Sequence, residues 1–272
     1  GSQKIPFAVG NVVSSNKSSG HTQLDPGMFE INNAQDYISE LKKHYVLADI
    51  AERKEEILKQ LAKVDGNIVS QDQVLAQVLH LVEWPQLTTA TFDENFLKAP
   101  KEVLTSEMVE HQKYFPVADD NGDLKNIFVI TANNTPSDKI RKGNQKVLSA
   151  RLSDGVFLYE QDLKTPIEMF NKKLATITFQ KDLGSVYAKV ERIVTNTAIL
   201  YSHLKIGNLD LAVRAATLCK ADLASELVDE FPSLQGVIGQ YYALAHGEDP
   251  IVAQAINEHW MPRNEKAPMP QS

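Results

Sequence analysis

The sequence contains one cysteine, Cys219, among 272 residues. A single thiol excludes an intramolecular disulfide and a zinc site built from cysteines, and it is typical of proteins that fold in a reducing cytosol. No apolar run approaches the length of about 18 residues that a membrane-spanning helix needs, and no signal-peptide pattern is visible. These absences predict a cytoplasmic protein that does not enter a membrane, with Cys219 as a small buried hydrophobic residue.

Catalytic and cofactor motifs are also missing. None of the 13 glycines falls into phosphate-loop or dinucleotide-binding spacing, and there is no Gly-x-Ser-x-Gly elbow or His-Glu-x-x-His pair. Asp119, Asp120 and Asp123 surround Asn121-Gly122 as at the start of a calcium loop, but no Glu stands at the twelfth position. A tight hairpin turn is the better interpretation. The sequence therefore predicts no catalytic residue, no cofactor and no metal ligand in this chain.

The charge balance is mildly acidic. The chain carries 28 Lys and Arg against 35 Asp and Glu, which gives a formal net charge of -7. An anion-binding surface therefore requires local clustering of cations on one face. The length allows one large domain or two ordinary ones. Gly1-Ser2 is typical of a cleaved purification tag, and the polar end at residues 262–272 predicts a piece excised from a longer protein.

The first hundred residues mix short strands with helices. Residues 7–13 are expected to form one edge strand, and His21 is expected to be an incidental loop side chain. Two helices then follow capping boxes, in which a side-chain oxygen accepts a free amide at the helix start. The boxes are Asp49 with Glu52 and Ser70 with Gln73. The apolar stripes expected to be buried are Ile50, Ile57, Leu61 and Val64, then Val74, Leu75, Val78 and Leu81.

A hairpin and a long helix complete the first half of the chain. Residues 88–92 contain three β-branched threonines and predict a strand, and Lys101 begins a helix that runs to about Gln112. Strands at residues 114–117 and 127–131 then flank the Asn121-Gly122 turn. The long helix is predicted over residues 138–159, and its buried side is expected to contain Ile140, Val147, Leu148 and Leu152.

The composition changes at about residue 163. From Lys164 onward it favours helices with little strand signal, and the longest is predicted from Val186 to Leu204 by the spacing of its apolar residues. We therefore predict an α+β module over residues 1–163, followed by an all-α helical domain over residues 164–272.

The helix at residues 138–159 is the most cationic element. Five positive side chains lie between residues 139 and 151, where Asp138 is the one acidic residue next to them, and Lys113 lies close to the helix in sequence. Such a row is suited to contact a phosphate backbone, with counterion release that makes affinity depend on salt. A solvated helix face without a ligand is the alternative. The candidate binding residues are Lys113, Lys139, Arg141, Lys142, Lys146 and Arg151.

One segment of the helical half contains a carboxylate that could suggest a metal site. Lys220-Ala221-Asp222 occurs there together with His203 and His246. A metal-dependent phosphohydrolase of the HD type needs an adjacent His-Asp pair as ligands. Because a cationic amine cannot ligate a metal, the presence of Lys220 argues against a working metal centre.

Several segments of the chain resemble one known family. They are VEWP at residues 82–85, HQKYFPV at 111–117, GNQKVLSARLSD at 143–154, KADL at 220–223 and EFPSLQG at 230–236. In this order they are similar to the β subunit of bacterial glycyl-tRNA synthetase, and the similarity covers most of the chain. A departure is Gly20-His21-Thr22-Gln23, where the family usually has Gly-His-Arg-Phe.

The resemblance implies a fragment of a multi-domain β subunit. In that family an α part, separate or fused, holds the site that activates glycine with ATP and Mg, and the β part contributes binding of tRNA(Gly). The first half then resembles the editing-type module of phenylalanyl-tRNA synthetase, and the second half the truncated start of an HD-like helical domain. The fragment alone is expected to be inactive in aminoacylation.

Two alternatives remain open from the sequence. One is a hydrolase, which edits mischarged tRNA or cleaves phosphoesters in the helical half. The other is a purely structural spacer between subunits.

Overall fold

The computed structural model describes residues 3–265 and 267–272, so that the expected tag remnant Gly1-Ser2 lies outside the described residues. The chain forms two compact units. The first contains Gly1–Lys101 and Thr105–Arg151, and the second contains Glu102–Leu104 and Leu152–Ser272. The change of unit thus falls inside the long helix, ahead of the composition change at residue 163. The reason is that Leu158 and Tyr159, near the end of this helix, pack on the core of the second unit.

The first unit begins with two small antiparallel ladders. The strands β1 (Ala8–Val9) and β2 (Val12–Val13) pair around Gly10, so that residues 7–13 form a hairpin in place of the single edge strand that was predicted. The second ladder joins β3 (Lys17–Ser19) to β4 (Met28–Glu30), and α1 (Tyr37–Lys43) follows. His21 is completely buried, and its Nδ1 accepts hydrogen bonds from the amides of Gln23 and Leu24 at 3.2 Å. It therefore fixes this loop.

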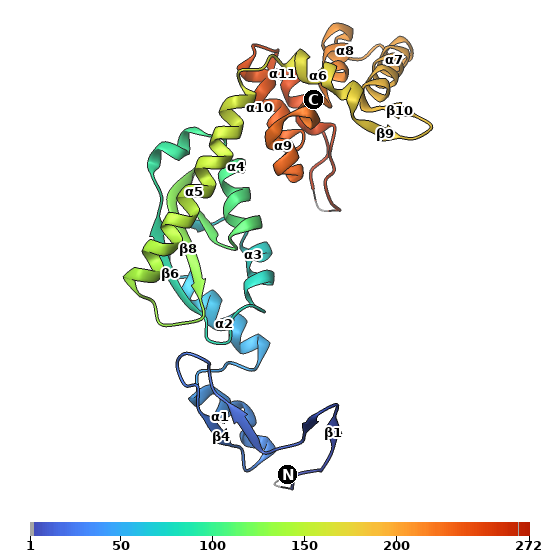
Figure 1. Ribbon diagram of the computed structural model, residues 1–272. Helices are drawn as coiled ribbons and strands as arrows, with labels where there is room; N and C mark the ends of the chain where they lie inside the picture. The colour runs from blue at the N-terminus through green and yellow to red at the C-terminus, as the bar shows by residue number, and fades with distance from the viewer. Residues whose placement is uncertain (1–2, 266) are drawn as a thin grey trace. The chain divides into compact units, whose positions relative to one another are not determined.

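A four-stranded antiparallel sheet is the centre of the first unit (Figure 1). The strands lie in the order β5-β7-β8-β6, which leaves β6 at one edge. The predicted Asn121-Gly122 hairpin is confirmed as the connection between β7 and β8. The strands are β5 (Asn67–Ile68), β6 (Gln86–Thr91), β7 (Phe115–Ala118) and β8 (Leu124–Ala132).

Helices α2 (Ile50–Leu61) and α3 (Gln71–Val78) cover one face of this sheet. Ile57, Val74 and Phe115 are completely buried between the helices and the strands. The opposite face meets α5 (Asp138–Asp162), the predicted long helix. There Asn144 of α5 accepts a hydrogen bond from the hydroxyl of Tyr114, whose ring packs on Phe128 of β8 at 5.0 Å between centroids.

The two predicted capping boxes have different outcomes. Asp49 caps α2 as expected, because its carboxylate accepts the amides of Ala51 and Glu52. Ser70 precedes α3 in the left-handed region, at φ 52°, and its side chain makes no capping hydrogen bond. The prediction for Ser70 was wrong, because a left-handed residue does not aim its side chain at the helix amides as an extended N-cap does.

The apolar stripes are buried at their centres and exposed at their flanks. Leu81 is 64% exposed because it follows the end of α3 at Val78, and Val147 is 47% exposed on α5. The burial predicted for these two was wrong, as it was for Ile50 at the first position of α2. The predicted helix after Pro100 exists as α4 (Lys101–Ser106), which continues as a π-helical turn over Glu107–His111.

The second unit is mostly helical. Its core contains Phe170, Leu218, Ile238, Tyr242 and Ile256. A short hairpin of β9 (Thr178–Gln180) and β10 (Gly184–Ser185), which was not expected, precedes the predicted long helix α7 (Val186–Leu204). The other helices are α6 (Ile167–Lys173), α8 (Leu209–Leu218), α9 (Glu226–Glu230), α10 (Val237–Ala245) and α11 (Pro250–Glu258).

The molecule is thus a mixed α/β protein with a helical C-terminal part. Over the described residues, no helix combines the length and the apolar character that crossing a bilayer demands.

The different roles of Asp49 and Ser70 can be measured directly. Replacement Asp49→Ala removes the acceptor of two helix amides, and we expect it to lower the free energy of unfolding by about 1 kcal/mol. Ser70→Ala is the matched control, and it should change stability by less than about 0.5 kcal/mol because no cap is lost. Urea denaturation followed by circular dichroism gives both values. Equal losses in the two variants would contradict the assigned caps.

Candidate functional site

A cleft of about 820 Å³ runs along the free edge of β6. Gln60 of α2 and residues 63–65, which follow that helix, line one side of it. Arg141, Lys142 and Gln145 of α5 line the other side. Residues 87–91 of β6 also line it, together with Ile127 and Val129 of β8. The cleft therefore lies where a sheet edge is accessible between two helices.

Two glutamines cap the ends of this edge. The amide N–H of Leu87 donates to Oε1 of Gln60 at 2.8 Å, and Nε2 of Gln145 donates to the carbonyl of Thr91 at 2.9 Å. Gln145 also donates to the Thr91 hydroxyl at 3.2 Å. Each primary amide takes the place that a neighbouring strand would occupy, and this satisfies main-chain groups that an edge otherwise leaves unpaired.

Three cations lie around the cleft. Lys63 stands just past the end of α2, and Arg141 and Lys142 lie in the first turns of α5. Arg141 is paired with Asp138 at 2.7 Å, whereas the described residues give Lys142 no ion pair. Asp65, the acidic residue of the lining, is held by Lys125 at 2.8 Å, and this partner lowers the pKa of the Asp65 carboxyl. The cleft is thus locally positive in a protein of net negative charge.

Two of the six predicted binding residues line the cleft, and the other four do not. Arg141 and Lys142 line the cleft. Lys139 and Lys146 are exposed on the same helix, but at 100° per residue they point away from the buried Leu148. Arg151 is exposed about one and a half turns beyond Lys146 on α5.

Lys113 also lies away from the cleft. It is in the left-handed region at φ 58°, directly after the π-helical turn, and its Nζ donates to the carbonyl of Glu110. Lys63 belongs to the cleft but was not among the predicted residues. In the sequence it is one lysine after a solvated helix, and nothing in its spacing distinguishes it.

Tyr114 is part of the core and not of the surface. It is buried against Phe128, and this burial raises the pKa of its hydroxyl to about 12. Its bond to Asn144 and the bond of Gln145 to Thr91 attach successive residues of α5 to the sheet. These two contacts set which side chains of α5 face the cleft.

The side chains of Lys220 and Asp222 make packing contacts inside the second unit. Asp222 is buried, and its Oδ2 accepts the amides of Gly236 and Gly239. Burial raises the pKa of this carboxyl to about 6. The ammonium of Lys220 lies 3.3 Å from the ring centroid of Trp260. No cluster of three or more His, Cys, Asp or Glu suited to a metal occurs in the described part of the chain.

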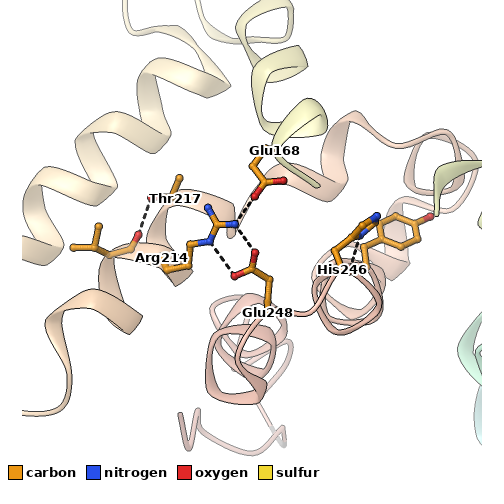
Figure 2. A network of polar contacts seen from close by, with 7 residues as sticks. Glu168, Arg214, Thr217, His246 and Glu248 are labelled. Atoms are coloured by element: carbon orange, nitrogen blue, oxygen red, sulfur yellow. Dashed lines mark hydrogen bonds and ion pairs between the residues drawn. The ribbon is translucent and has the colours of Figure 1, made fainter. Parts of the chain in front are cut away.

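An arginine joins three segments of the same unit (Figure 2). The guanidinium of Arg214, on α8, donates from Nε to Glu248 at 2.9 Å and from Nη2 to both Glu248 and Glu168. These bonds raise the pKa of Arg214 and lower that of Glu168. Glu168 belongs to α6 and Glu248 follows α10, so that one fork-shaped side chain ties together elements distant in sequence.

Lys220 gives this unit a measurable pH dependence. Burial lowers the pKa of Lys220 to about 8, from 10.5 for a free lysine. The folded state therefore binds fewer protons than the unfolded state between these values, and the contribution of Lys220 to stability increases as the pH rises from 8 to 10.5.

Lys220→Met removes this titration while keeping the length of the side chain. We expect the unfolding free energy of the parent protein to rise relative to the variant by about 1–3 kcal/mol between pH 8 and pH 10. Urea unfolding monitored by Trp260 fluorescence, with Trp84→Phe in both proteins, measures the difference. A difference that is constant over this pH range would contradict the lowered pKa.

The family model described as glycyl-tRNA synthetase beta subunit matches residues 1–272. A protein of Acaryochloris marina (strain MBIC 11017), named glycine–tRNA ligase beta subunit, is 42% identical over 99% of this chain and 39% of its own length. A protein of the same name from Pseudomonas putida (strain GB-1) is 41% identical over 100% of this chain and 41% of its own. The chain spans about two fifths of the length of these relatives, and it belongs to the glycyl-tRNA synthetase beta subunit family.

Proposed function

We propose that this chain is the tRNA-docking part of a glycine–tRNA ligase, an aminoacyl-tRNA synthetase of protein biosynthesis in the cytoplasm. Membership of the β-subunit family supports the assignment to this enzyme. In this proposal a separate or fused α part, with ATP and Mg, activates glycine. The present chain binds tRNA(Gly) and orients it toward that site. We also propose that residues 1–163 correspond to an editing-type module and residues 164–272 to an HD-like helical domain.

The observation that carries the docking role is the cationic face of α5. Lys139, Lys142 and Lys146 follow each other at spacings of three and four residues, are exposed, and have no ion pair among the described residues. Spacings of this kind place side chains on one side of a helix, in a row about 10 Å long at 1.5 Å per residue. Unpaired ammonium groups need no existing partner to be displaced before they bind phosphates.

The chemistry required is electrostatic. Each ammonium that approaches a phosphate releases condensed counterions, so that affinity falls as salt is added. The contacts carry no sequence information, and they fix orientation and register along the RNA backbone. Other parts of the enzyme then have to distinguish the nucleotide sequence of tRNA(Gly) from that of other tRNAs. Arg141 and Lys142 at the cleft extend the same positive surface toward the sheet edge.

A salt titration tests this role. We expect the combined variant Lys139→Ala, Lys142→Ala and Lys146→Ala to bind tRNA(Gly) more weakly. The slope of log affinity against log salt should become shallower by about 2–3, because three phosphate contacts are lost. Filter binding between low and physiological salt measures both quantities.

The matched control removes three exposed lysines from other parts of the first unit, namely Lys54, Lys59 and Lys98. It changes the net charge equally and should leave the slope within about one unit of the parent value. If both variants behave alike, or if neither differs from the parent protein, α5 is not the docking surface and the chain acts as a spacer. Glycine-dependent ATP–pyrophosphate exchange by this chain alone would contradict the placement of the chemistry in the α part.

A further inference from the structure

The edge of β6 presents unpaired main-chain groups inside the cleft. The main chains of Leu87 and Thr91 point away from β8, since the Leu87 N–H donates to Gln60 and the Thr91 carbonyl accepts from Gln145. Thr88 and Ala90 alternate with these outward-pointing residues along β6. Main-chain groups of a strand alternate in direction, so the N–H and the carbonyl of Thr89 also point outward. The described residues provide no hydrogen-bond partner for them there. One donor and one acceptor therefore remain available at the centre of the edge.

The lining of the cleft favours one class of ligand. Unpaired nucleic-acid bases are held largely by stacking on aromatic rings or guanidinium planes. None of the described lining residues is aromatic, and its one guanidinium, Arg141, is paired with Asp138. The main-chain groups of the edge instead have the spacing that another peptide strand requires. The surrounding charge is positive on both sides of the sheet, from Lys63 and from Lys142.

We propose that this cleft binds an extended acidic peptide segment of a partner protein, which adds to β6 as a short fifth strand. Thr89 exchanges two main-chain hydrogen bonds with the central residue of that segment. Successive side chains of the segment point to opposite faces of the sheet, so that neighbouring carboxylates meet Lys63 on the α2 side and Lys142 on the α5 side. Gln60 and Gln145 occupy the ends of the edge and limit the added strand to a few residues.

This proposal is independent of the tRNA-docking role. The peptide depends on the main chain of Thr89, whereas phosphate docking depends most on the lysines of α5 that point away from the sheet. Lys142 is the residue that both would use. The two roles can therefore fail separately: loss of peptide binding in Thr89→Pro leaves tRNA binding unchanged, and loss of tRNA binding does not require loss of the Thr89 hydrogen bonds.

The test uses a fluorescein-labelled peptide of sequence Val-Glu-Glu-Val-Thr, blocked at both ends, and fluorescence polarisation with the whole chain. Thr89→Pro removes the outward N–H and leaves the ladder to β8 intact, because an edge strand tolerates proline where its N–H faces solvent. Thr89→Ala is the matched control, since it changes the side chain and keeps the N–H. We expect the peptide to bind saturably, Thr89→Pro to weaken it about fivefold, and Thr89→Ala to leave it within about twofold.

A second probe does not depend on how the proline variant folds. The same peptide with N-methyl groups on its central residues cannot donate to the edge, and a peptide with Lys in place of Glu has the wrong charge. Both are expected to bind at least about fivefold more weakly to the parent protein. The proposal is overturned if the acidic peptide shows no saturable binding, if the N-methylated peptide binds equally well, or if a short oligouridylate competes for the cleft and loses affinity in Thr89→Pro.

Discussion

Two side-chain hydrogen bonds fix the rotation of α5 on the sheet, and the directions of the cations in the proposed binding surfaces follow from that rotation. Asn144 accepts from Tyr114 in the core, and Gln145 donates to Thr91 at the sheet edge. With Leu148 completely buried on the same helix, the direction of every cation on α5 is determined. Arg141 and Lys142 then face the cleft, while Lys139 and Lys146 face solvent. A rotation by one residue, about 100°, would separate the cations from the sheet edge.

The free edge of β6 is protected from pairing with other chains only at its two ends. An open edge strand invites unwanted pairing with other chains, and proteins commonly protect it with charge or with side-chain caps. Here Gln60 and Gln145 cap the two ends, and Lys63, Arg141 and Lys142 surround the middle. Positive charge on both sides disfavours pairing with a second copy of the same edge, because like charges would be brought together. The same charge leaves the edge accessible to an acidic strand, and protection and selectivity thus have one physical origin.

Local patterns predicted the elements of this fold well, but not the directions of their side chains. The Asn121-Gly122 turn and the Asp49 cap depend on residues adjacent in sequence, and both were found from the sequence alone. Ser70 has the same spacing as Asp49, yet its backbone is left-handed and its side chain makes no capping hydrogen bond, which the spacing does not record. Val147 fits the apolar period of α5 but is 47% exposed, about 100° around the helix from the completely buried Leu148. Lys63 and Thr89 acquire a role only when α2, β6 and α5 meet, so spacing within one segment could not identify them.

The helical unit shows how a sequence that suggests metal chemistry can serve packing instead. The Oδ2 atom of Asp222 accepts two glycine amides, and a side chain on Gly239 would come within 2.9 Å of that oxygen. This carboxyl group therefore holds the start of α10 close to the turn that contains Asp222. Burial raises its pKa, which favours the neutral form. Lys220 places its charge on Trp260, where a cation–π contact partly replaces lost hydration. A metal bound at Oδ2 of Asp222 would have to replace the hydrogen bonds from the amides of Gly236 and Gly239. The residues that most resemble a catalytic pair are thus those that hold this unit together, and the binding surfaces that we propose lie instead on the sheet edge and α5.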